Sequence, residues 1–215
     1  IHRGAMLETY HDGTQEVVGT TFIDDFNWDR IAETSYRYGF EVDTINGCLK
    51  NTRTAAYWIY RGVQFCGKNS PFIMGFDISF ADVTGGGDRT SIGFANGTGA
   101  MFGYDKTLGI YAHGYYKIGA GSVTGPYPMT AGVTYRHLYV CDGIRSYLYR
   151  DGVLLFSSTN LFTETAGFLG IAHYEMGSPR TPIISNLFVI AASPDAINGI
   201  AACIPPIGGG ARYGV

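Results

Sequence analysis

Residues 135–156 read YRHLYVC DG IRSYLYR DG VLLF, and this stretch decides the fold of the chain. Two Asp-Gly pairs, Asp142-Gly143 and Asp151-Gly152, divide it into three runs rich in Tyr, Leu and Val. Asp-Gly supplies the positive φ angles of the tight turns that join antiparallel strands. The stretch therefore predicts a three-stranded antiparallel meander.

The same alternation of apolar and polar residues extends along the chain. In residues 72–80 every second residue is Phe, Met or Ile, as in a strand with one buried face. Further strands are predicted at residues 21–26, 55–60, 90–94, 108–113, 135–141, 144–150, 153–157, 168–172 and 183–191. Helical periodicity occurs only in residues 27–35. No repeat of fixed period is visible in the sequence, which argues against a propeller. Many short strands between turn residues predict an all-β, two-sheet antiparallel sandwich.

The length of 215 residues suits one such domain with flanking arms. We expect an N-terminal arm over residues 1–18, the sandwich over 19–191 and a Pro- and Gly-rich arm over 192–215. Met6 is a candidate native start, in which case residues 1–5 derive from a vector. The C-terminal arm is apolar, so we expect it to cover its own domain or a neighbouring subunit, in a homo-oligomer or larger assembly.

Composition excludes several classes of partner. The net charge of -3 and the absence of a basic cluster argue against nucleic acid binding. The sequence contains no run of about 20 apolar residues, so we do not expect membrane insertion. The four cysteines, Cys48, Cys66, Cys141 and Cys203, lack the Cys-x-x-Cys spacing of zinc sites, and we expect buried free thiols.

The opening stretch, followed later by ISNLFV at residues 184–189, resembles the C-terminal half of a laminin-G-like or concanavalin A-like jelly roll. In that family a strand ending in Asp-Gly precedes a short apolar strand. The resemblance implies a jelly roll, in a family that includes lectins and glucan hydrolases. The low charge, Gly-rich loops and apolar tail are also similar to phage virion proteins such as tail-fibre and decoration modules.

Catalysis in the hydrolases of this family requires two neighbouring carboxyls on one strand, in Glu-x-Asp-x-Glu or Glu-x-Asp-x-x-Glu. The nearest match is EVDTIN, from Glu41 to Asn46, which places an amide where the second Glu belongs. An amide cannot donate and regain a proton. The sequence also lacks Gly-x-Ser-x-Gly, a phosphate-binding loop and His-Glu-x-x-His. We therefore expect a strand with two outward acids and no enzyme.

We expect no cofactor, and the one candidate is a calcium ion bound beside the ligand. Asp82 and Asp88 flank Gly85-Gly86-Gly87, and their carboxylates would converge on a cation if this loop folds back. The alternative is that these acids initiate turns.

Glycan binding requires flat aromatic faces with polar tips, and the chain has 16 Tyr. In residues 108–113, Leu108, Ile110 and Ala112 should face the core, leaving Tyr111 and His113 on the opposite face. The candidate glycan-binding surface comprises Arg89, Tyr104, Tyr111, His113, Tyr115, Tyr116 and Tyr127. The alternative is that these rings fill the core.

The leading hypothesis is a non-catalytic module for carbohydrate recognition or surface attachment, in a virion or extracellular assembly. Its partner would be a glycan or cell-surface polysaccharide. The alternatives are a purely structural capsid or filament subunit and, third, a glucanase-type glycoside hydrolase.

Overall fold

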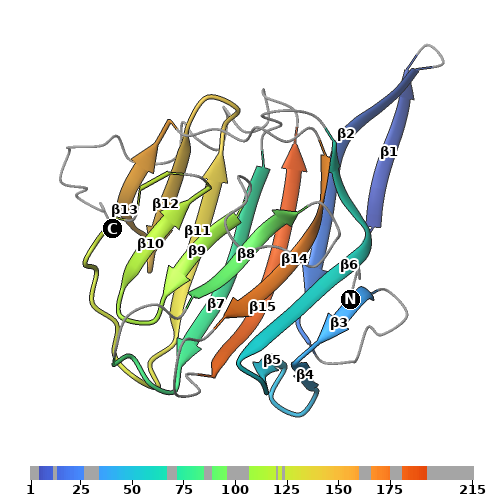
Figure 1. Ribbon diagram of the computed structural model, residues 1–215. Coiled ribbons are helices and arrows are strands. Elements are labelled where there is room, and N and C mark those ends of the chain that lie inside the picture. The colour runs from blue at the N-terminus through green and yellow to red at the C-terminus, as the bar shows by residue number, and fades with distance from the viewer. Residues whose placement is uncertain are drawn as a thin grey trace, which may run out of the picture.

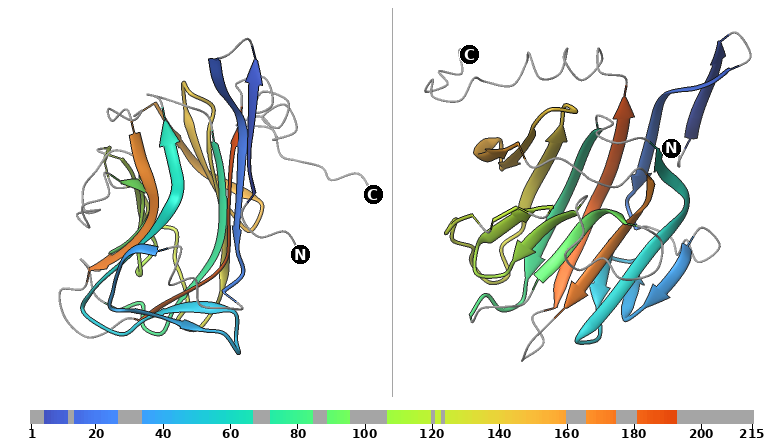
Figure 2. Two further views of the ribbon diagram at one scale, coloured as in Figure 1. Left: turned by 90° about the vertical axis from the view of Figure 1, so that its right-hand side faces the viewer. Right: turned by 45° about the horizontal axis from the view of Figure 1, so that its top comes forward.

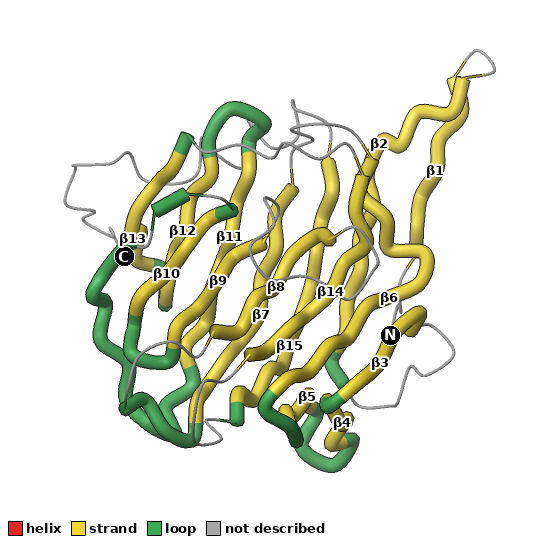
Figure 3. The backbone as a smooth tube through the Cα atoms, in the orientation of Figure 1, coloured by secondary structure: helices red, strands yellow, loops and turns green. Residues whose placement is uncertain are grey.

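The computed structural model describes residues 5–11, 14–26, 34–66, 72–84, 89–95, 107–119, 121–122, 124–159, 166–174 and 181–192. These residues form strands and loops (Figure 3). The strands make two antiparallel sheets, which lie face to face when the molecule is viewed edge-on (Figure 2). The predicted all-β sandwich is therefore confirmed.

The larger sheet has nine strands (Figure 1). Seven of them lie in the order β1 (Ala5–His11), β2 (Thr14–Asp24), β15 (Pro182–Ala192), β7 (Phe72–Phe80), β11 (Tyr135–Cys141), β12 (Ser146–Arg150) and β13 (Val153–Ser158). The remaining two, β4 (Phe40–Asp43) and β5 (Cys48–Asn51), form a hairpin whose β5 pairs with β15. The smaller sheet has the order β10 (Tyr115–Ile118), β9 (Thr107–Tyr111), β8 (Arg89–Ala95), β14 (Ala166–Tyr174), β6 (Ala55–Cys66) and β3 (Thr34–Tyr38).

The core lies between the two sheets and follows the alternation of the sequence. On β7, the side chains of Phe72, Met74, Phe76, Ile78 and Phe80 all belong to it. They meet inward-facing residues of the six-stranded sheet, among them Trp58 and Ile110. Complete burial of one such side chain contributes roughly 1.5–3 kcal/mol to folding. Cys48 and Cys141 are buried free thiols, as expected.

The meander predicted from residues 135–156 is present as β11–β12–β13. Asp151 and Gly152 have φ angles of 50° and 80°, as a two-residue turn between antiparallel strands requires. The first turn is longer, because the Asp142 carboxylate accepts the backbone N–H of Ile144 at 2.7 Å. Strand β12 consequently begins at Ser146, two residues later than predicted.

Several elements differ from the sequence prediction. Residues 5–18, expected as an arm, contain β1 and the start of β2, which pair with each other in the nine-stranded sheet. The short strands β3, β4, β5 and β10 were not predicted. Residues 193–215 lie outside the described residues, so the C-terminal arm stays a prediction. The helical pattern of residues 27–35 is tested only at Thr34 and Ser35, which belong to strand β3.

Strand β15 changes its neighbour halfway along. Ile183 and Ile184 pair with β5, whereas residues 187–192 pair with β2. Between them the register against β7 shifts, and Asn186 adopts a φ of 52°. This β-bulge re-aims the Asn186 side chain. In the described part of the chain, no helix combines the length and the apolar composition of a membrane span.

Candidate functional site

The outer face of the six-stranded sheet carries a continuous cross-strand row of large side chains. Tyr115 of β10 pairs with Tyr111 of β9, Tyr111 pairs with Arg89 of β8, and Arg89 pairs with Tyr174 of β14. Directly paired residues on one face lie close enough for their side chains to contact. We call Tyr115, Tyr111, Arg89 and Tyr174 the tyrosine row. All four are at least partly exposed.

His113 joins the tyrosine row at the turn between β9 and β10. Its ring centroid lies 5.8 Å from that of Tyr111 and 4.8 Å from that of Tyr115. Gly114 makes this turn possible with a φ of 89°, and its carbonyl accepts the backbone N–H of Tyr127 at 2.8 Å. A side chain at Gly114 would collide with the Tyr127 carbonyl. The segment around Tyr127 therefore holds the turn that carries His113 in place.

Two cationic side chains, Arg89 of the tyrosine row and Lys117, flank Gly109. A Cβ placed on Gly109 would lie 2.9 Å from Cδ of Arg89 and 3.6 Å from Cβ of Lys117. The aliphatic part of Arg89 thus lies over the missing side chain of Gly109, where any larger residue would displace it. Lys117 pairs with Gly109 on the neighbouring strand. Glycine at this position leaves room for the Arg89 and Lys117 side chains on the same part of the face.

A buried hydroxyl lies next to this pair of cations. Ser91 pairs with Gly109 and alternates with Ile92, which belongs to the core. Its side chain is fully buried, and its Oγ has no hydrogen-bond partner among the described residues. Unsatisfied buried hydroxyls are uncommon in folded proteins.

The structure brings together four of the seven predicted glycan-binding residues: Arg89, Tyr111, His113 and Tyr115. Tyr104 lies outside the described residues. Lys117 and Tyr174 were missed by sequence reasoning. Lys117 follows Tyr115 by two positions, so alternation would have found it had residues 115–118 been recognised as a strand.

Tyr116 and Tyr127 do not belong to this surface, which corrects the prediction. Tyr116 faces the core and is 0% exposed, so neither face of its ring is open to a sugar. Tyr127 is half-buried; its ring stacks on Phe156 with centroids 6.3 Å apart, and its hydroxyl donates to the carbonyl of Leu155 at 2.9 Å. Successive residues of a strand face opposite ways, so Tyr115 and Tyr116 have different roles.

Tyr116 instead belongs to a buried polar network. The His137 ring stacks on Phe76, and its Nδ1 lies 3.1 Å from the carbonyl of Tyr135. A carbonyl only accepts, so Nδ1 carries the proton and Nε2 accepts from the Tyr116 hydroxyl at 2.9 Å. Arg150 donates to the same hydroxyl at 3.4 Å. Burial lowers the pKa of His137 to about 4 and raises the pKa of Tyr116 to about 12.

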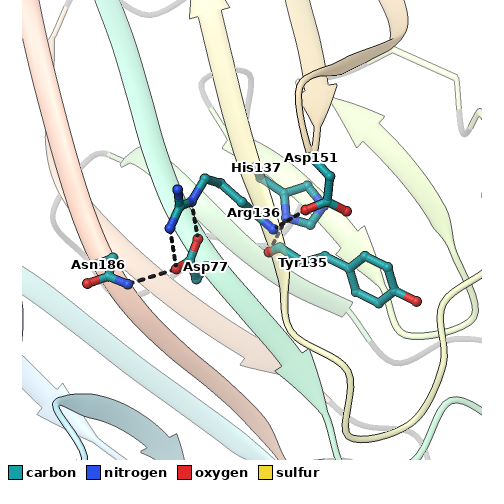
Figure 4. Close-up of polar contacts among 6 residues, drawn as sticks. All are labelled: Asp77, Tyr135, Arg136, His137, Asp151 and Asn186. Carbon is teal, nitrogen blue, oxygen red and sulfur yellow. Dashed lines mark hydrogen bonds and ion pairs between the residues drawn. The ribbon is translucent and has the colours of Figure 1, made fainter.

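The nine-stranded sheet carries a polar cavity of about 470 Å³, lined by Asp77, Thr134, Arg136, Asp151 and Gly152. Asp77 accepts hydrogen bonds from Nε of Arg136 at 3.1 Å and from Nδ2 of Asn186 at 2.7 Å (Figure 4). Asp151 accepts the backbone N–H of Arg136 at 2.9 Å. The ion pair raises the pKa of Arg136. These contacts tie β7 and β11 to the bulge of β15.

The EVDTIN segment forms β4 and the turn into β5. Asp43 accepts hydrogen bonds from Lys50 and from Nδ2 of Asn46, the latter at 2.7 Å. The bond from Lys50 is the main reason that the pKa of Asp43 lies well below its ordinary value. A carboxylate held ionised in this way cannot donate a proton near neutral pH. Its hydrogen bonds make Asp43 a poor candidate for the proton donor of a glycoside hydrolase, and Asn46 stabilises the turn.

The calcium prediction is tested only in part. The carboxylate of Asp82 accepts from the backbone N–H of Thr84 at 2.7 Å and from its hydroxyl at 2.8 Å. This is an Asx-type turn, which agrees with the alternative role of turn initiation. Asp88 lies outside the described residues. Within the described ranges, no group of three or more His, Cys, Asp or Glu is arranged to hold a metal ion.

No protein-family model and no curated protein matches this sequence. Several solved structures nevertheless have a similar fold. A sialidase matches with a TM-score of 0.60 and 14% identity over 81% of this chain, which spans only 18% of the sialidase.

A Bacillus subtilis protein of unknown function with a galectin-like fold matches with a TM-score of 0.57 and 11% identity, over 80% of this chain and 96% of that one. The β-glucanase of Bacillus licheniformis matches with a TM-score of 0.54 and 9% identity, over 80% of this chain and 98% of the glucanase. Identities this low show the fold alone, and that fold is the predicted jelly-roll β-sandwich.

Proposed function

We propose that this chain is a non-catalytic carbohydrate-recognition module that binds a glycan on the tyrosine row. The observation that carries the proposal is the alignment of Tyr115, Tyr111, Arg89 and Tyr174 across four paired strands. A tyrosine ring offers an apolar face to the C–H side of a pyranose and a hydroxyl to its rim. Arg89 adds several fixed hydrogen-bond donors for sugar hydroxyls.

The way the rings are held also supports recognition. They project from paired strands rather than from a long loop, and His113 lies within ring contact of both Tyr111 and Tyr115. Side chains ordered before binding lose little conformational freedom when a ligand arrives. A sheet face of this kind therefore suits an extended oligosaccharide lying across several strands.

The comparisons support the proposal through the fold. The same sandwich occurs in a sialidase, a β-glucanase and a protein with a galectin-like fold. Because one fold hosts many activities, the site and not the likeness carries the assignment. We further propose that the module attaches a virion or an extracellular assembly to a cell-surface polysaccharide.

A second candidate function is structural assembly. On the face of the nine-stranded sheet turned away from the core, Ile73, Val140 and Tyr149 form a separate apolar cluster, packed against partly buried Leu138 and Phe188. The three central residues are at most 7% exposed, so the apolar surface that would contact another protein consists of the partly buried side chains around them. Truncation after Ala192 tests this alternative: a fall in oligomeric mass, measured by light scattering, together with an absence of glycan binding would establish it.

The test of recognition is binding of the purified chain to a glycan array, repeated with Tyr111→Ala and Tyr115→Ala. We expect each substitution to weaken binding by about tenfold or more. Tyr38→Ala is the control, since Tyr38 is an exposed tyrosine of the same sheet, at 44%, but lies on the far edge strand β3. Binding that is absent, or that survives both row substitutions, would reject the proposal.

The same preparation tests the hydrolase alternative. We expect no turnover of β-glucans, because Asp43 is held as an ionised acceptor and Asn46 is an amide. Turnover that disappears in Glu41→Gln would establish a glucanase instead.

A further inference from the structure

The two sheets differ in their content of acidic residues. The strands of the nine-stranded sheet contain Glu8, Glu16, Asp24, Glu41, Asp43 and Asp77. The six strands of the smaller sheet contain neither Asp nor Glu, but they contain Arg37, Arg61, Arg89 and Lys117. A chain with a net charge of -3 therefore has one sheet whose strands carry only cationic charges.

Two of these cations lie at the candidate site. Arg89 and Lys117 flank Gly109 on the outer face, immediately beside the tyrosine row. Arg89 already has a contact within the chain, whereas Lys117 makes no ion pair within the described residues. The acids nearest along the chain, Asp88, Asp105 and Glu175, belong to connecting segments outside the described residues. An anion bound between Arg89 and Lys117 would be attracted by both.

We infer that the ligand of the tyrosine row is an anionic glycan, whose carboxylate or sulfate group binds between Arg89 and Lys117 while a pyranose ring stacks on Tyr111 or Tyr115. This inference rests on the proposed function. The guanidinium fork of Arg matches the two oxygens of a carboxylate or sulfate, and the Lys ammonium adds a point charge. Carboxylate and sulfate share the chemistry that this pair of cations recognises.

The neighbouring rings narrow the choice to a sugar anion. A surface that bound polyanions by charge alone would not need flat rings in line with its cations. Here one cation lies within the row, between Tyr111 and Tyr174, and Lys117 lies two residues from Tyr115. The arrangement matches a ligand that alternates ring faces with anionic groups.

The experiment compares immobilised glycans that carry anionic groups with neutral partners built on the same sugar backbone. The pairs are polygalacturonate with its methyl ester, dextran sulfate with dextran, and sialyl-lactose with lactose. We expect at least one anionic member to bind about tenfold or more tightly than its neutral partner, with an affinity that falls as salt is added. The pair that shows the difference identifies carboxylate or sulfate as the preferred group.

Lys117→Gln and Arg89→Gln should each remove most of this difference, and Lys117→Arg should restore it. Arg145→Gln is the control of equal charge, because Arg145 is exposed in the β11–β12 turn of the other sheet. The melting temperature of each variant establishes that it is folded.

Equal binding of charged and neutral partners through Tyr111 would overturn this inference and leave the proposed function intact. Absence of binding to every glycan would overturn both. Equally tight, Lys117-dependent binding of single-stranded DNA would show that the face reads charge alone, which also overturns the inference.

Discussion

The outer faces of the two sheets use their polar side chains differently. On the nine-stranded sheet, Asp77, Arg136 and Asn186 bond to one another and hold the bulge of β15 in place (Figure 4). On the six-stranded sheet, Lys117 makes no ion pair within the described residues and stands beside partly exposed rings. A polar cavity alone is therefore a weaker sign of recognition than a row of side chains that faces outward.

The sharpest form of this comparison is the pair Tyr115 and Tyr116, adjacent in sequence and opposite in orientation. We predict that Tyr116→Ala lowers the free energy of unfolding by about 3–5 kcal/mol, because it empties a fully buried site and removes the hydrogen-bond donor to Nε2 of His137. Tyr115→Ala should cost less than about 1 kcal/mol and act on glycan binding instead. Urea denaturation of both variants measures the difference. Similar losses of stability would contradict the assignment of the two faces.

The next largest effect concerns pH. The pKa of His137 is about 4 in the folded chain and about 6.5 when unfolded. The unfolded state takes up a proton first, so stability should fall as pH drops from about 6.5 to about 4, by roughly 3 kcal/mol in total. In His137→Gln this slope should disappear. Asp43, whose pKa is lowered, loses its contribution only at more acidic pH. A wild-type stability that is flat between pH 6.5 and 4 would refute the buried, neutral His137.

The smallest effect should come from the polar cavity. Asp77→Asn removes the negative charge that Arg136 and Asn186 contact. The effect is small because the Arg136 side chain is 75% exposed, so solvent screens the ion pair. We predict a loss of about 1–2 kcal/mol in unfolding free energy and no change in glycan affinity. Thermal unfolding and array binding on the same sample check both parts. Weaker glycan binding in a fully folded variant would indicate that the ligand binds on the nine-stranded sheet instead.

Much of the fold was predictable because its signals are local. Alternation placed β7 and β11 at their observed bounds, and the Asp-Gly pairs placed both turns of the meander. Strands β4 and β5 were not predicted because each has only four residues, too few for a pattern. Strand β10 was missed because its four residues lie between Gly114 and Gly119, a pattern typical of a loop.

The candidate site was predictable only in part. Tyr111 and His113 were correctly placed opposite Leu108 and Ile110, since alternation within one strand decides this. The inclusion of Tyr116 was wrong because its orientation depends on how β10 pairs with β9. A shift of one residue in that pairing would exchange the faces of Tyr115 and Tyr116.

By itself the sequence determined that this chain forms antiparallel strands with one apolar face each, because the period of two and the Asp-Gly turns act between near neighbours. It also determined that EVDTIN has an amide, Asn46, where the second Glu of the hydrolase motif belongs. Only the tertiary structure decided that Arg89 stands between Tyr111 and Tyr174, since these residues come from three strands far apart in the chain. Cross-strand register is a long-range property, and the proposed glycan site depends on it.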